Sequence, residues 1–229
     1  MNENRGVARP DAQRTAASKL NLAQDWPELR VPLEKHSLYR KVDRLLGRLT
    51  PGRVIEIGCA DGRFLEVLRQ RGWSVVGAEL QGQEHEYIRQ LDASEPLPFG
   101  PEFDVVLAVE VIEHMADTSS FLANCAAILK PGGILILTTP NLLFGVNRLL
   151  MLAGKQPRIA YADFHLHMFV WDDLRSKLDE HFAVVERRGS HVLLGVRRSR
   201  LFVVFERLGD WFPTLAAHFV VVARKRDPA

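Results

Sequence analysis

Short apolar runs alternate with segments of helical spacing through the first two thirds of the chain. Four apolar runs are bounded by glycine, proline or charged residues, at 54–57, 74–79, 103–109 and 134–139. Their mostly hydrophobic character is typical of strands that are buried on both faces. Apolar residues recur at helical spacing between them, at 36–49, 63–71 and 121–129. This alternation predicts an α/β fold with a parallel sheet and right-handed crossovers.

The rhythm changes after residue 140. Lys-Pro-Gly-Gly at 130–133 is a stop signal for the preceding helix. A Leu-rich segment at 141–161 follows, which we expect to be a buried helix; the alternatives are a lid over an apolar acceptor and a contact with a lipid carrier. The remaining predicted elements are a helix at 171–178, a strand at 182–187, a helix at 201–212 and a strand at 218–224.

The two ends of the chain differ in character. Residues 1–35 are polar and contain three prolines, so we expect a loosely ordered extension with a short helix at 16–24. Residues 36–229 are expected to form one domain. The first residues lack the apolar core of a signal peptide, and no segment is long enough to span a bilayer. We therefore expect a cytoplasmic protein.

Composition excludes several classes of protein. Hydrophobic residues make up 47% and charged residues 25%, as in ordinary globular domains. The net charge of +2 is too small to indicate nucleic acid or an anionic membrane by itself. The two cysteines, Cys59 and Cys125, do not form a CxxC pair, so neither a disulfide scaffold nor a zinc ribbon is indicated.

The segment VIEIGCADGRF joins the first apolar run to a helix through small residues. Glycines let the backbone approach a ligand closely, and the start of the helix offers free N–H groups. Glu79 ends the next strand, where a carboxylate accepts hydrogen bonds from the hydroxyls of a ribose. This pattern predicts a nucleotide site, which NAD-type oxidoreductases also have.

Three details favour S-adenosylmethionine over a dinucleotide. The glycine spacing is Gly58-x-x-x-Gly62, which lacks the third glycine of the dinucleotide fingerprint. Glu56 lies inside the motif, where it suits the ammonium group of a methionine and would repel a pyrophosphate. Asp92 lies between the second and third clear strands, where an adenine amino group needs an acceptor.

Five motifs in order, VIEIGCADGRF, VVGAEL, LDASEPLPF, FDVVLAVEVIEHM and LKPGGILILTTPN, resemble the class I S-adenosylmethionine-dependent methyltransferases over residues 36–224. The resemblance implies a doubly wound, mostly parallel, Rossmann-like sheet of seven strands with an antiparallel last strand. It implies these cofactor-binding residues: Glu56, Gly58 and Gly62 for the methionine end, Glu79 for the ribose, Asp92 and Ala93 for the adenine, Val109 and Glu110 beside the cofactor, and also Cys59, Ala60 and Leu80. One departure is Ala60, where many relatives have glycine.

Candidate bases for the acceptor lie in two clusters, EVIEH at 110–114 and FHLHMF at 164–169. If the first cluster is helical, Glu110, Glu113 and His114 share one face. Histidine suits proton transfer because its ordinary pKa is about 6.5. The catalytic candidates are His114, His165 and His167.

A metal site is an alternative for the same residues. Glu110, Glu113, His114 and His167 offer the oxygen and nitrogen ligands that suit a divalent ion which polarises a hydroxyl. Small-RNA terminal 2′-hydroxyl methyltransferases and some quinone-precursor O-methyltransferases have a similar pattern. Other relatives share the EVIEH segment without a known metal, so the primary expectation is no metal.

The favoured function is O-methylation of a small-molecule, sugar or carrier-linked hydroxyl. The C-terminal part resembles bacterial methyltransferases of cell-surface sugar pathways, which is an analogy at the level of the fold. The alternatives are metal-assisted 2′-O- or catechol-type methylation and a non-catalytic partner protein with the same fold. Nucleic acid is not an expected partner, contact with a membrane surface is an alternative, and the sequence leaves the oligomeric state open.

Overall fold

The computed structural model describes residues 37–81, 86–158, 165–192 and 200–227. The chain divides into two units, 1–32 and 33–229, and every described residue belongs to the second. The predicted extension 1–35, with its helix at 16–24, lies outside the described residues. Among the residues that the structure describes, no helix has both the length and the apolar character needed to cross a membrane.

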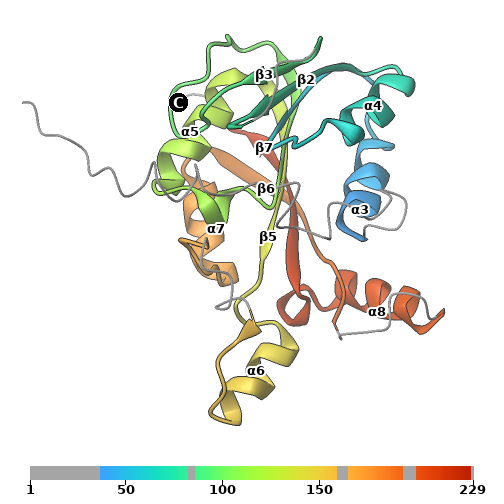
Figure 1. Cartoon of the computed structure of the whole chain (residues 1–229), viewed down its shortest axis with the longest axis vertical. Helices are drawn as coiled ribbons and strands as arrows, with labels where there is room; N and C mark the ends of the chain where they lie inside the picture. The colour runs from blue at the N-terminus through green and yellow to red at the C-terminus, as the bar shows by residue number, and fades with distance from the viewer. Residues whose placement is uncertain (1–36, 82–85, 159–164, 193–199, 228–229) are drawn as a thin grey trace, which may run out of the picture. The chain divides into compact units, whose positions relative to one another are not determined.

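Seven strands form one sheet in the order β3-β2-β1-β4-β5-β7-β6. The strands are β1 (Arg53–Ile57), β2 (Ser74–Glu79), β3 (Ile88–Gln90), β4 (Phe103–Val109), β5 (Leu129–Pro140), β6 (Phe182–Gly189) and β7 (His218–Lys225). β7 runs antiparallel to both of its neighbours, and the other paired strands are parallel. The predicted fold class, with its antiparallel last strand, is confirmed (Figure 1).

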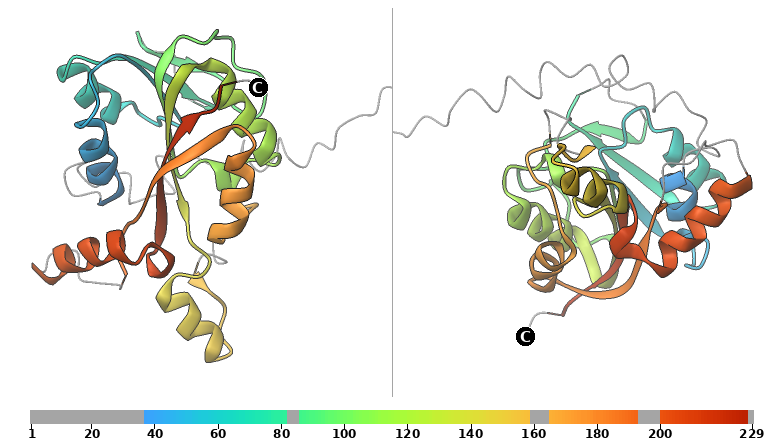
Figure 2. Two further views of the ribbon diagram at one scale, coloured as in Figure 1. Left: turned by 180° about the vertical axis from the view of Figure 1, so that it is seen from behind. Right: turned by 90° about the horizontal axis from the view of Figure 1, so that it is seen from below.

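Helices cover both faces of the sheet (Figure 2). α3 (Ser37–Leu46) and α4 (Arg63–Gln70) lie on one face, and α5 (Thr118–Ile128) and α7 (Trp171–Asp179) lie on the other. Alternate side chains of a strand point to opposite faces. In β5, Ile136 packs with α3 and α4, whereas Leu135 and Leu137 pack with α5 and α7.

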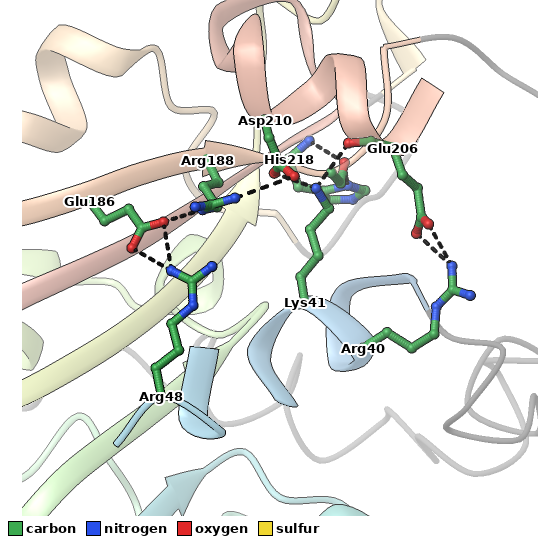
Figure 3. A network of polar contacts seen from close by, with 9 residues as sticks. Arg40, Lys41, Arg48, Glu186, Arg188, Glu206, Asp210 and His218 are labelled. Atoms are coloured by element: carbon green, nitrogen blue, oxygen red, sulfur yellow. Dashed lines mark hydrogen bonds and ion pairs between the residues drawn. The ribbon is translucent and has the colours of Figure 1, made fainter. Parts of the chain in front are cut away.

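α8 (Arg200–Trp211) is attached to α3 by buried charges (Figure 3). Lys41 of α3 is almost fully buried and donates to the Glu206 carbonyl and to Asp210, and Arg40 forms a bidentate pair with Glu206 at 2.7 Å. Burial lowers the pKa of Lys41, and the nearby Asp210 and Glu206 carboxylates oppose that shift. The two acids lie four residues apart, so they share the helix face that meets α3.

Three local predictions need correction. β3 was not predicted, because its three residues have no apolar alternation. Lys-Pro-Gly-Gly does mark the end of the preceding helix, since α5 ends at Ile128, but the strand predicted at 134–139 begins earlier. β5 starts at Leu129, with an irregular register between its pairs at Leu129 and Ile134. The helix predicted in the Leu-rich segment exists as α6 (Gly145–Leu152), but it is not buried, since Asn147 is its one buried residue.

Candidate functional site

Polar and small residues gather at one edge of the sheet. Parallel strands end at the same edge, and the antiparallel β7 begins there. The edge residues are Gly58 after β1, Glu79 at the end of β2, Glu110 after β4, Asn141 after β5, Ser190 after β6 and His218 at the start of β7. In open α/β sheets this edge is where ligands bind.

The loop after β1 has the shape that close ligand approach requires. Gly58 and Gly62 both have a φ of 73°, and Ala60 between them has a φ of 49°. A Cβ atom on Gly58 would lie 2.7 Å from Cγ2 of Val111, so only glycine fits there. The backbone N–H of Ala60 donates to Oε2 of Glu79 at 2.7 Å, which ties the loop to the end of β2.

Glu56 is fully buried in the middle of this region, on the sheet face covered by α3 and α4. Neither of its carboxylate oxygens has a hydrogen-bond partner of ordinary geometry among the described residues, although the Tyr39 hydroxyl lies beside the group. Burial raises the pKa of Glu56 to about 8, and Tyr39 partly offsets this rise. A buried acid of this kind is suited to a cationic ligand, so it fits the methionine ammonium of the expected cofactor.

The other predicted cofactor residues follow the same edge. Glu79 is nearly buried, and its second oxygen accepts from the N–H of Leu80 at 2.9 Å. Asp92 is exposed and accepts from the N–H and hydroxyl of Ser94, whereas Ala93 beside it is buried. The remaining two are Cys59, whose thiol is buried, and Val109, buried at the end of β4. Their order along the edge matches the order of parts in an adenosyl ligand, and their roles stay predictions.

Glu110 has a backbone conformation that few side chains adopt, with a φ of 57°. Its Oε1 accepts from the Thr138 hydroxyl at 2.7 Å, and its Oε2 lies 3.4 Å from Nε2 of His218. The prediction that Glu110, Glu113 and His114 share one helix face is wrong. The left-handed turn at Glu110 ends the strand, and only a single 3-10 turn, η3 (Ile112–His114), follows it.

His218 and Ser190 were missed at the level of the sequence. Nδ1 of His218 lies 2.9 Å from the Ser190 hydroxyl oxygen, which also accepts from the N–H of His218 at 3.0 Å. Ser190 is fully buried, so its hydroxyl hydrogen needs an acceptor within the protein, and Nδ1 of His218 is that acceptor. This arrangement assigns the ring proton to Nε2, the nitrogen that faces Glu110.

A second polar cluster is built around Glu113, which is almost fully buried. Its Oε2 accepts from the Thr139 hydroxyl at 3.0 Å, and its Oε1 lies 3.9 Å from Nε2 of His114. Burial, reinforced by the nearby Glu110 carboxylate, raises the pKa of Glu113 well above its ordinary value.

The loop before α7 completes this cluster. The N–H groups of Leu166 and His167 both donate to the Glu113 carbonyl, which places the His165 ring 5.1 Å from the His114 ring. Potential ligand atoms of Glu113, His114 and His165 lie within 4.8 Å of one another. Within the described residues, Glu110 and His167 do not join this group, and the His167 ring instead stacks on Phe169.

Two neighbouring threonines of β5 each support a different one of the two clusters. Thr138 holds Glu110, and Thr139 holds Glu113. Consecutive side chains of a strand point to opposite faces, so the Glu110–His218 pair lies toward the α3 and α4 face, and the Glu113 cluster lies toward the α5 and α7 face. Glu56 lies on the same side as the Glu110–His218 pair.

Comparisons with known proteins agree with this geometry. Curated relatives include the ubiquinone biosynthesis O-methyltransferases of Rhodopseudomonas palustris (strain BisB18), 34% identical over 49% of this chain and 50% of the relative, and of Dinoroseobacter shibae (strain DSM 16493 / NCIMB 14021 / DFL 12), 37% identical over 39% and 41%. The chain therefore spans about half the length, or less, of these relatives.

Solved structures share the fold. A SAM-dependent methyltransferase from Archaeoglobus fulgidus superposes with a TM-score of 0.60 at 18% identity, over 86% of this chain and 96% of that one. The Burkholderia thailandensis 1,6-didemethyltoxoflavin-N1-methyltransferase, solved with S-adenosylhomocysteine, gives a TM-score of 0.62 at 18% identity over 98% and 94%.

The family described as "Methyltransferase domain" matches residues 29–185, which is more than half of the chain. That match includes β1 to β5 and both polar clusters apart from Ser190 and His218. The buried Glu56, the glycine loop and Glu79 fit the adenosyl cofactor of this family. The chain thus belongs to the methyltransferase domain family, and its cofactor is S-adenosylmethionine.

Proposed function

We propose that this protein is an S-adenosylmethionine-dependent O-methyltransferase of a small-molecule, sugar or carrier-linked hydroxyl. The observation that carries the proposal is the pairing of His114 and His165 beside the buried Glu113, next to the end of β4. O-methylation of a hydroxyl needs a group that removes a proton, and histidine provides one near neutral pH. The curated relatives are named O-methyltransferases, which supports the choice of oxygen.

The residues of the chain have separate tasks in this reaction. When bound, the cofactor would supply a methyl group activated by a sulfonium, with a neutral thioether as the leaving group. Glu56 would hold the ammonium of the cofactor and Glu79 its ribose, and both would thereby position it for transfer. His114 accepts the acceptor proton, while Glu113 and His165 orient its ring. We assign to His167 the task of orienting the loop, and not that of the base.

Calorimetric titration tests the cofactor site first. We expect S-adenosylhomocysteine to bind and NAD not to bind. Glu79→Ala is expected to weaken binding at least about tenfold, because two backbone N–H groups and the ribose lose their acceptor. Glu79→Gln is the matched control for size. A folded wild-type protein that binds no S-adenosylhomocysteine would instead favour the non-catalytic partner protein.

Methyl transfer from labelled S-adenosylmethionine to a panel of hydroxyl, amine and carbon acceptors tests the reaction class. We expect transfer to hydroxyl acceptors, reduced at least about a hundredfold in His114→Ala. His181→Ala serves as a control, since His181 lies in the turn between α7 and β6. Transfer to amines alone would contradict O-methylation.

A second candidate is metal-assisted methylation of a catechol or a 2′-hydroxyl. It is favoured by the group Glu113, His114 and His165, whose donor atoms are close enough to share one ion. Dialysis against a chelator, followed by addition of Mg²⁺, Mn²⁺ or Zn²⁺, distinguishes the two. Activity that is lost on chelation and restored by one ion would establish this second candidate; unchanged activity would remove it.

We also propose a cytoplasmic location and a single catalytic domain at 36–229. Cys59 and Cys125 are free and buried, as expected in a reducing compartment. Fractionation of cells that produce the tagged full chain tests the location.

A further inference from the structure

Large apolar side chains are exposed at the end of the domain where β5 finishes. On α6, Leu149 is 65% exposed and Leu152 is 86% exposed, and at the end of α8, Trp211 is 80% exposed, with Phe212 beside it also exposed. We call these four residues, together with Met151, the α6–α8 surface. Figures 1 and 2 show α6 and α8 at the same end of the domain.

The two helices are joined at their bases. Arg148 of α6 donates to the carbonyl of Thr214 at 3.1 Å, and Thr214 belongs to the 3-10 turn η5 (Pro213–Leu215) that follows α8. Asn141 donates to the same carbonyl at 3.1 Å. These contacts tie the base of α6 to the turn that follows α8, and the exposed apolar residues lie on the two helices on either side of that junction.

The charged residues on α6 and just after it are all basic. Residues 141–161 contain no Asp or Glu but contain Arg148, Lys155 and Arg158. The side chains of Leu150, Lys155, Gln156 and Arg158 line an open hollow of about 530 Å³. Two cations beside exposed leucines are the chemistry of a site for a phosphate headgroup at an apolar boundary.

α8 separates its charges by face. Its acids, Glu206 and Asp210, turn inward to Arg40 and Lys41 (Figure 3). Its exposed face has Val204, Arg207 and Trp211 at positions i, i+3 and i+7, so tryptophan and arginine share the side that faces away from α3. Tryptophan with arginine on an exposed amphipathic helix is typical of the boundary between lipid and water.

We propose that the α6–α8 surface docks on an anionic lipid bilayer. Leu149, Leu152 and Trp211 enter the boundary between headgroups and acyl chains, and Lys155 and Arg158 bind lipid phosphates. A nucleic acid would match the cations but would leave the leucines exposed to water. This inference goes beyond the proposed function and does not depend on it.

Docking has a consequence for the acceptor. β5 ends at Pro140, Asn141 is the next residue, and α6 begins four residues later at Gly145. The docked surface is thus connected directly to the edge of the sheet that forms the candidate site. An acceptor attached to a lipid would reach this edge from the membrane plane.

Co-sedimentation of the full chain with vesicles tests the proposal. We expect binding to vesicles of equal parts phosphatidylglycerol and phosphatidylcholine, weak binding to pure phosphatidylcholine, and a decrease as salt rises. Leu152→Glu and Trp211→Glu are each expected to weaken binding at least about fivefold. Val185→Glu, at a residue 58% exposed on β6, is the matched control and should bind like the wild type. Lys155→Glu should also weaken binding, whereas Lys177→Glu on α7 should not.

Trp211 is its own spectroscopic probe. The difference between wild-type and Trp211→Phe emission should shift to shorter wavelength on addition of the anionic vesicles, and should not shift with free inorganic phosphate.

Failure to bind anionic vesicles at low salt, or binding that Leu152→Glu and Trp211→Glu leave unchanged, would overturn the proposal. A dimer in sedimentation equilibrium that Leu152→Glu dissociates, without vesicle binding, would assign the surface to a second copy of the chain. Trp211 emission that is already blue in the free full chain would assign it to a segment of the same chain.

Discussion

Nε2 of His218 lies 3.4 Å from Oε2 of Glu110, although the two residues are more than a hundred positions apart in the chain. The antiparallel return of β7 beside β5 brings them together, and Thr138 supports the same carboxylate from β5. Ser190 sets the ring orientation from the end of β6. The carboxylate that the family resemblance assigns to the cofactor is therefore held by residues of β5 and β7, with Ser190, just after β6, supporting it through His218.

We predict that His218→Ala weakens the binding of S-adenosylhomocysteine about tenfold, because the Glu110 carboxylate loses a group that positions it. His218→Gln keeps an N–H donor and should lose less than about threefold. Calorimetric titration measures both affinities, with His181→Ala as the control histidine. Wild-type affinity in His218→Ala would show that Glu110 does not need this partner.

The raised pKa of Glu56 predicts a pH dependence of stability. The unfolded chain ionises this group near its ordinary value of 4.5, whereas the folded protein retains the proton up to about pH 8. The unfolded state therefore binds fewer protons across this window, and stability falls as pH rises through it. We expect the Tm of the ligand-free protein to fall between about pH 6 and pH 8, and to fall less in Glu56→Gln. Equal slopes in the two proteins would contradict the assignment.

Cofactor binding should change the preferred form of Glu56 from the protonated acid to the charged carboxylate. A ligand ammonium favours the charged carboxylate, so binding releases a proton and affinity rises with pH over the same window. Calorimetry in two buffers of different ionisation enthalpy measures the released proton directly. Glu56→Gln should bind more weakly and release no proton at this site.

Ala60 is predicted to destabilise the glycine loop slightly. Its φ of 49° costs an alanine about 1 kcal/mol relative to glycine. Ala60→Gly should therefore raise the free energy of unfolding by about 0.5–1 kcal/mol in urea, with cofactor affinity retained. Ala123→Gly is the matched control inside α5 and should lower it by about as much. The prediction fails if both substitutions destabilise.

We expect the buried ion pair between α3 and α8 to contribute more to the free energy of unfolding than an exposed ion pair does. Lys41→Ala removes the buried cation that donates to Asp210 and to the Glu206 carbonyl, while Arg188 still lies 3.6 Å from Asp210, and should cost about 2 kcal/mol of unfolding free energy. Arg48→Ala removes an exposed pair with Glu186 and should cost less than about 1 kcal/mol. Urea unfolding of the two variants measures the difference, and equal costs would show that burial does not decide it.

Regular apolar patterns predicted most of the fold. The expected bounds of β2 and β4 coincide with the observed ones because a mostly apolar run, with polar residues at or near its ends, sets each of them. β3 was missed because its pairing with β2 depends on tertiary packing and leaves no local pattern. The Leu-rich helix α6 was expected to be buried, since composition alone does not show what a helix meets.

The candidate site was predictable where short motifs place residues, and not where distant strands combine. Glu56, Gly58 and Glu79 come from one βαβ unit, so their common edge follows from the motif. The residues of EVIEH separate into two polar clusters because Glu110 has a left-handed φ, which the sequence pattern does not reveal. His218 and Ser190 join the site through β7 pairing, for which the chain gives no local signal.

The neighbouring threonines of β5 have an evolutionary consequence. Thr138 donates to Glu110, on the side of the proposed cofactor site, and Thr139 donates to Glu113, beside the two histidines. Because one rigid strand supports both, their spacing stays constant while the loops on each face change independently. Under the proposed function, with the acceptor bound beside His165, mutations there can change the acceptor without disturbing the proposed adenosyl site, so that new substrate preferences arise while the methyl donor is kept.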